Sequence, residues 1–269
     1  VVFKAINNNK TYAVRCFLTA ENENIERYRH ITSYLKSIEE SWITEVYLFE
    51  NEIALSGKYY PVIIMDWVDG VLLNKYVNQI KSNNELLTAL QVEILAVSQS
   101  LESNKVGHGD IQSGNIIITN DSTGKAKVKL IDYDGMFVPS LINKQNLERG
   151  RAEFQHSNRN QLVFNEKIDR FSFWVILCAL EALKFDKDLW LEVMQGGFNT
   201  LDNMLFTGKD FANTQSSVLF NRLTSINQPS LNFYLSKLKT FCVTDPNKIE
   251  SVKLYDNLNI EENTEIEKE

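Results

Sequence analysis

Residues 108–115 read HGDIQSGN, and residues 132–135 read DYDG. Between these two polar clusters lie two short runs rich in β-branched residues, 116–119 and 127–131, separated by the sequence NDSTG. Such runs on either side of turn-forming residues predict a β-hairpin. The hairpin decides the interpretation because it determines which polar side chains meet at its open end.

A turn centred between Thr123 and Gly124 places Asn115 opposite Asp132, and Asp110 enters on the preceding loop. Two carboxylates and an amide oxygen then converge. Hard oxygen ligands of this kind suit Mg²⁺ or Mn²⁺ that carries the phosphates of a nucleotide. Each cluster alone fits turn-capping residues of an ordinary hairpin equally well, and their joint spacing favours the metal site.

Together the two clusters resemble the catalytic loop, HRDxxxxN, and the metal-binding motif, DFG, of protein kinases. This resemblance implies an α+β, two-lobed fold with a small β-rich lobe and a larger, mainly α-helical lobe. It implies that Asp110 is the catalytic base, that Asn115 and Asp132 bind metal, and that His108 is structural. The cofactors implied are ATP with Mg²⁺ or Mn²⁺.

An earlier strand, residues 11–17, resembles the kinase sequence VAIK. The resemblance implies that Ala13 lets adenine approach and that Arg15 takes the place of the phosphate-binding lysine, with a part in catalysis. Arginine keeps the positive charge and binds phosphate through a planar fork, but it is bulkier than lysine. Taken alone, Arg15 also fits a surface arginine on a strand.

Residues 60–70 form an apolar strand that runs into an acidic connection, and they resemble the kinase hinge. The resemblance implies that Met65 lies beside the adenine pocket and that the backbone of Asp66 and Val68 binds the adenine edge. Ile117 would then lie under the base, where aliphatic side chains are usual. A buried strand followed by a turn would explain the same residues without a ligand.

Two further elements have expected places in this pattern. Residues 169–180 read as a helix that is apolar nearly all round and therefore internal. The resemblance implies that Asp169, at its start, bonds back to the catalytic-loop backbone. A helix over residues 24–38 should carry the acidic partner of Arg15, and Glu26 is the candidate, with Glu23 nearby.

Several features depart from the kinase pattern. Gln112 stands where serine/threonine kinases have a lysine, and Asp134 stands in the glycine position of DFG. Residues 152–156 match the end of the activation segment poorly, and no glycine-rich loop precedes the Arg15 strand. We expect a chain that lacks the first strand and this loop through truncation, whereas their true absence would favour a pseudokinase.

Composition limits the class of protein. The chain has 269 residues, 43% of them hydrophobic and 23% charged, which predicts a globular protein of one two-lobed domain. Its net charge of −7 argues against nucleic-acid binding. Three cysteines without metal-type spacing, and no secretory or membrane-spanning segment, predict a cytoplasmic protein. The expected parts are a partial small lobe at 1–69, a large lobe at 70–255 and a disordered acidic tail at 256–269.

Three functions follow as hypotheses. The first is an atypical protein kinase that transfers the γ-phosphoryl group of ATP to serine or threonine of a protein substrate. The second is a pseudokinase that serves as a nucleotide-binding or interaction module. The third is a small-molecule phosphotransferase, because two carboxylates spaced as in DYDG also resemble aminoglycoside and choline kinases. The combined motifs further resemble a set of bacterial kinase-like proteins.

Overall fold

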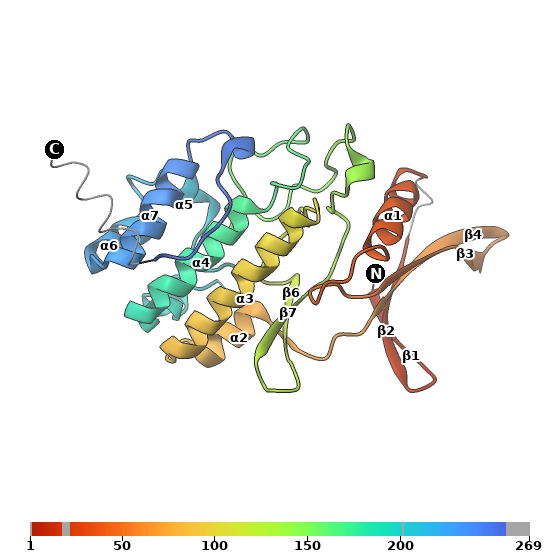
Figure 1. Ribbon diagram of the computed structural model, residues 1–269, viewed down its shortest axis with the longest axis horizontal. Coiled ribbons are helices and arrows are strands. Elements are labelled where there is room, and N and C mark those ends of the chain that lie inside the picture. The colour runs from red at the N-terminus through yellow and green to blue at the C-terminus, as the bar shows by residue number, and fades with distance from the viewer. Residues whose placement is uncertain (1, 18–21, 201, 257–269) are drawn as a thin grey trace.

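The computed structural model describes residues 2–17, 22–200 and 202–256 and has two lobes (Figure 1). The smaller lobe contains an antiparallel sheet with helix α1 beside it, and the larger lobe is mainly helical. The predicted two-lobed α+β architecture is therefore confirmed. The predicted acidic tail lies, from residue 257 onward, outside the described residues.

The small-lobe sheet presents one face to the other lobe. Its register pairs Ala13 with Met65 and Arg15 with Ile63. Because successive side chains of a strand point to opposite faces, these four residues share one face of the sheet. In spatial order the strands are β1 (Val2–Asn7), β2 (Lys10–Cys16), β4 (Lys58–Asp66) and β3 (Val46–Leu55).

Helix α1 (Asn22–Leu35) buries one face, which contains Tyr28, Ile31 and Leu35. Their spacing of three and four residues matches the period of a helix. The buried face packs beside the sheet, with contacts to β3 (Figure 1). Tyr28 is thereby directed from α1 toward the space between the lobes.

A second, three-stranded sheet begins just after β4, in the interval where we predict the lobe boundary. It contains β5 (Val71–Leu72), β6 (Ile116–Asn120) and β7 (Ala126–Leu130). The pair β6–β7 is the hairpin predicted from the sequence, and it carries the two polar clusters at its open end.

The predicted register of this hairpin is wrong by one residue. Ile116 pairs with Leu130, and the carbonyl oxygen of Asn115 accepts a hydrogen bond from the N–H of Ile131, not of Asp132. The cause is the turn: the carboxylate of Asp121 accepts hydrogen bonds from the amides of residues 123 and 125, which centres the loop on residue 123.

The large lobe is organised around helix α4 (Arg170–Phe185), which is buried from Phe171 to Leu183 as its apolar sequence predicts. Helices α3 and α7 pack against it. Within the described ranges, no helix is both long and apolar enough to span a bilayer. The other helices and short 3-10 turns are α2 (Leu73–Ile80), α3 (Asn84–Ser103), η1 (Pro139–Leu141), η2 (Lys187–Trp190), η3 (Val193–Gln195), α5 (Gly208–Ala212), α6 (Val218–Ile226), α7 (Pro229–Phe241) and η4 (Pro246–Lys248).

Candidate active site

A cavity of about 470 Å³ lies between the two lobes. Its walls come from β2, β4 and the connection after β4 on one side, and from β6 and the loop after β7 on the other. This volume is within the range of small-molecule and cofactor sites. All residues predicted to contact nucleotide or metal line it: Ala13, Arg15, Met65, Asp66, Val68, Asn115, Ile117 and Asp132.

The end of the cavity near the lobe connection is apolar and has free backbone groups. Ala13 and Met65 are paired across β2 and β4, and Ile117 approaches from β6 in the other lobe. The N–H of Asp66 donates to a backbone carbonyl 2.9 Å away, which leaves only its own carbonyl for a ligand. No backbone hydrogen bond involves Val68 in the part of the chain that the structure describes. A planar ring with polar edges would find apolar faces and backbone partners here.

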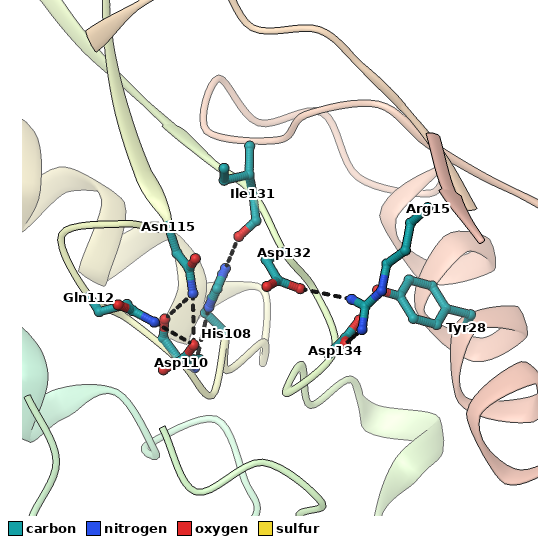
Figure 2. Close-up of polar contacts among 9 residues, drawn as sticks. All are labelled: Arg15, Tyr28, His108, Asp110, Gln112, Asn115, Ile131, Asp132 and Asp134. Atoms are coloured by element: carbon teal, nitrogen blue, oxygen red, sulfur yellow. Dashed lines mark hydrogen bonds and ion pairs between the residues drawn. The ribbon is translucent and has the colours of Figure 1, made fainter. Parts of the chain in front are cut away.

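The opposite end of the cavity is charged. Arg15 extends from β2 to the loop after β7, where its guanidinium pairs with two carboxylates (Figure 2). Its Nη1 lies 3.2 Å from Oδ1 of Asp132, and its Nη2 contacts Oδ2 of Asp134. The hydroxyl of Tyr28, from helix α1, donates to Oδ1 of the same Asp134.

Glu26 is not the partner of Arg15, and this prediction is wrong. The Glu26 carboxylate lies 3.5 Å from Nζ of Lys144 and 4.0 Å from Nε2 of His30, half exposed to solvent. Residues two apart on a helix point about 200° apart, so Glu26 faces away when Tyr28 faces the core. The spacing of three and four residues between Tyr28, Ile31 and Leu35 is visible in the sequence. It could have indicated that Tyr28, and not Glu26, lies on the buried face of the helix.

The surroundings of Arg15 shift the pKa values of three residues at the charged end of the cavity. Burial and the neighbouring Asp134 carboxylate raise the pKa of Asp132 above its usual range, although Arg15 opposes the shift. Burial is the largest single effect on Arg15 and lowers its pKa, but its acidic neighbours together, Asp134 first, outweigh burial and the net shift of the pKa is upward. Burial, and to a smaller extent the Asp134 carboxylate, raise the pKa of Tyr28 well above its usual value, so its hydroxyl remains a donor at neutral pH.

Asn115 and Asp132 fit the ligand set of a hard divalent cation. Nδ2 of Asn115 donates to Asp110, which leaves its amide oxygen as the ligand atom. Among the described residues, no three His, Cys, Asp or Glu side chains converge in a metal-binding arrangement. A cation here would need oxygens from a ligand as well, which is the usual situation of Mg²⁺ bound with a nucleotide.

The carboxylate of Asp110 is held within its own loop. Its Oδ2 accepts hydrogen bonds from Nε2 of Gln112 and Nδ2 of Asn115, each at 2.8 Å (Figure 2). Its Oδ1 is buried and has no hydrogen-bond partner among the residues that the structure describes. Gln112, a departure from the kinase pattern, thus binds the proposed catalytic base directly.

The segment after the DYDG cluster covers Asp110. Gly150 packs so closely that a Cβ atom on it would lie 2.9 Å from Oδ1 of Asp110. Arg159 fastens the segment, because its Nη2 donates to the carbonyl oxygens of Gly109 and Glu148. In this conformation a substrate hydroxyl has no open path to Oδ1 of Asp110. The sequence interpretation assigned no role to Arg159.

Hydrogen bonds between side chains and backbone groups connect the catalytic loop to the start of helix α4 and to the DYDG loop. The buried carboxylate of Asp169 accepts hydrogen bonds from the amides of His108 and Gly109, as the resemblance implied. His108 is fully buried, its Nδ1 accepts from the amide of Asp110, and its Nε2 lies 3.0 Å from the carbonyl oxygen of Ile131. The predicted structural positions of Asp169 and His108 therefore agree with these contacts.

Tyr133, the second residue of DYDG, was missed by the sequence interpretation. Its ring is fully buried and packs edge-on against His108, with 5.9 Å between the ring centroids. Its hydroxyl accepts from the amide of Thr44 at 2.8 Å and lies 3.0 Å from the carbonyl oxygen of Leu130. Tyr133 therefore joins the small lobe to the catalytic loop. The position of an aromatic residue between two carboxylates was the feature of the sequence that could have indicated this role.

Comparisons with known proteins support the fold. The chain is similar to the crystal structure of the Rad53 kinase domain and SCD2, with a TM-score of 0.57 and 15% sequence identity. The similarity covers 93% of this chain and 83% of that one, so it includes both lobes. No protein-family model and no curated protein sequence matches the chain. The fold is that of a protein kinase-like protein.

Proposed function

We propose that the chain is an ATP- and Mg²⁺-dependent phosphotransferase that modifies serine or threonine of a protein. The supporting observation is the cavity of about 470 Å³ between the lobes, with an apolar end at Ala13, Met65 and Ile117 and a charged end at Arg15 and Asp132. An adenine nucleotide has the same polarity along its length. The fold of the Rad53 kinase domain supports the same class of reaction.

In this proposal each polar residue of the charged end has one task. Arg15 binds the phosphates, because a planar guanidinium suits phosphate oxygens. Asn115 and Asp132 provide the protein oxygens for the cation. A bound Mg²⁺ would neutralise part of the charge on the transferring phosphoryl group. The remaining residues orient the nucleotide and exclude water.

Asp110 would accept a hydrogen bond from the substrate hydroxyl and take its proton during transfer. For a substrate hydroxyl to reach Oδ1 of Asp110, the segment near Gly150 would have to move off this atom. Gln112 and Asn115 would keep the carboxylate oriented from its other oxygen. Phosphoryl transfer of this kind depends mainly on positioning and charge stabilisation.

A pseudokinase is the second candidate, and the same covered Asp110 favours it. If the segment never leaves Asp110, the cavity can bind nucleotide without transferring phosphate. This alternative keeps Arg15, Asn115 and Asp132 as nucleotide-binding residues and gives Asp110 a structural task. A cytoplasmic location, a bacterial origin and the protein or small-molecule nature of the acceptor stay predictions from the sequence.

The test uses the full chain with radiolabelled Mg-ATP, a panel of protein substrates and a panel of small hydroxyl compounds. Asp110→Asn and Asp132→Asn should each abolish transfer, whereas Asp188→Asn, on the exposed surface, should leave it unchanged. Transfer that survives both site substitutions would refute the assigned mechanism. Mg²⁺-dependent ATP binding without transfer would select the pseudokinase, and transfer only to small compounds would select the third hypothesis.

A further inference from the structure

Arg15 has no acidic partner on helix α1 within the described residues. Its two partners, Asp132 and Asp134, both belong to the loop after β7. Helix α1 nevertheless reaches this group through Tyr28, which is 3% exposed, lines the cavity and donates its hydroxyl to Asp134. Helix α1 is therefore linked to the Arg15 guanidinium through the carboxylate of Asp134, which Tyr28 and Arg15 share.

The two oxygens of Asp134 have different partners. Oδ2 contacts Nη2 of Arg15, and Oδ1 accepts from the Tyr28 hydroxyl. Asp134 is less exposed than Asp132, with 21% against 49% of its side chain accessible, and only Asp132 lines the cavity. If the cation of the proposed function binds Asp132, that carboxylate turns toward the metal. Asp134 is then the carboxylate that keeps Arg15 in place.

Tyr28 is itself fixed on two sides. Its ring packs edge-on against Phe17, which follows strand β2, with 6.1 Å between ring centroids and an interplanar angle of 77°. Its carbonyl oxygen accepts a hydrogen bond from the hydroxyl of Thr32, one turn later in α1. A displacement of α1 would therefore move the Tyr28 hydroxyl relative to Asp134.

We propose that Tyr28 is a positioning residue that holds Arg15 through Asp134 and so couples the position of helix α1 to binding of the nucleotide phosphates. The proposal rests on the proposed function, because it assigns the phosphates to Arg15. It predicts an effect confined to ligands that carry phosphate. Contacts with the adenine end, at Met65 and Val68, lie at the other end of the cavity and should not change.

The test compares Tyr28→Phe with Tyr34→Phe in the full chain by calorimetric binding of Mg-ATP and of adenosine. Tyr34 is on the same helix, and its hydroxyl donates to the carbonyl oxygen of Asn104, 2.8 Å away, outside the cavity. Loss of one hydrogen bond to a charged group should weaken Mg-ATP binding by Tyr28→Phe about tenfold or more. Adenosine binding should be unchanged in both variants, and Tyr34→Phe should bind Mg-ATP normally.

Asp134→Asn provides a second approach, because it leaves Tyr28 in place and changes the carboxylate that Tyr28 and Arg15 share. If Tyr28 acts through Asp134, the double variant should bind Mg-ATP no more weakly than Asp134→Asn alone. Wild-type protein that binds neither Mg-ATP nor adenosine would refute the proposed function and this inference together. Wild-type binding of Mg-ATP with equal affinities in the two tyrosine variants would overturn the inference alone. Equal losses for Mg-ATP and adenosine in Tyr28→Phe would also overturn it, because they indicate a general structural role.

Discussion

Replacement of Asp169 by alanine should destabilise the protein by about 3 kcal/mol. The carboxylate is fully buried and accepts hydrogen bonds from the backbone amides of His108 and Gly109. A hydrogen bond to a charged group contributes about 1.5–3 kcal/mol, and two of them would contribute about 3–6 kcal/mol. Burial raises the pKa of Asp169, which shows that part of this gain offsets the desolvation of the carboxylate. The loss is large against a typical stability of about 5–15 kcal/mol.

Urea unfolding followed by tryptophan fluorescence measures this loss, because Trp42, Trp174 and Trp190 are buried in the folded protein. Asp245→Ala is the matched control. Asp245 also accepts from a backbone amide, that of residue 247 at 2.9 Å, but it is exposed, so water replaces the lost partner. The control should lose about 1 kcal/mol, as for an ordinary cap. Equal losses in the two variants, or a loss below about 1 kcal/mol for Asp169→Ala, would refute the reasoning.

Three further predictions follow. The neutral, buried ring of His156 donates to one backbone group and accepts from another, and burial lowers its pKa, so stability should fall as the pH drops below about 6.5. Melting temperatures between pH 7.5 and 5.5 should show this fall, with a flatter curve for His156→Gln. Gly109→Ala should lose more than about 2 kcal/mol in urea unfolding, because its φ is +80° and a Cβ atom would lie 2.0 Å from the carbonyl oxygen of Gly135. Gly124→Ala, with φ +82° and no atom within 4 Å, should lose only about 1 kcal/mol. Because the pKa of Asp132 is raised in the fold, its charged form opposes folding at neutral pH, and Asp132→Asn should raise the melting temperature of the ligand-free protein while removing stabilisation by Mg-ATP.

The elements that local sequence determines could be predicted. The β6–β7 hairpin follows from two β-branched runs around turn residues, and helix α4 follows from a run that is apolar on every side. The contacts of His108 and Asp169 also agree with their motif positions, although they join distant segments, because the resemblance to the kinase motifs implied this arrangement where local sequence could not. The error of one residue in the hairpin arose from a side chain, Asp121, whose hydrogen bonds set the centre of the turn.

Contacts between distant segments could not be predicted in the same way. The partner of Arg15 depends on the rotation of helix α1 about its axis and on how closely the helix approaches the DYDG loop. Neither quantity follows from the order of residues alone. The search for an acidic residue on α1 selected Glu26, which faces solvent, while the buried Tyr28 uses a carboxylate supplied by another segment. The position of the segment that covers Asp110 could not be predicted either, because it depends on the tertiary path of the chain around Gly150.

Three features depart from the kinase pattern: Arg15, Asp134, and a helix α1 whose described residues give Arg15 no acidic partner. They are better understood as one coupled change than as three separate defects. A lysine ammonium is a compact point charge, whereas a guanidinium presents a fork that can pair with two carboxylates at once. Arg15 uses this fork on Asp132 and Asp134, so an acid in the glycine position of DFG supplies the partner that the helix would otherwise provide. Tyr28, rather than a second acid, then suits the helix, because a third carboxylate near one cation would add repulsion while a hydroxyl adds a donor. Arg15 and Asp134 therefore give no independent evidence against catalysis, and the features that separate a kinase from a pseudokinase in this chain are Gln112 and the segment over Oδ1 of Asp110.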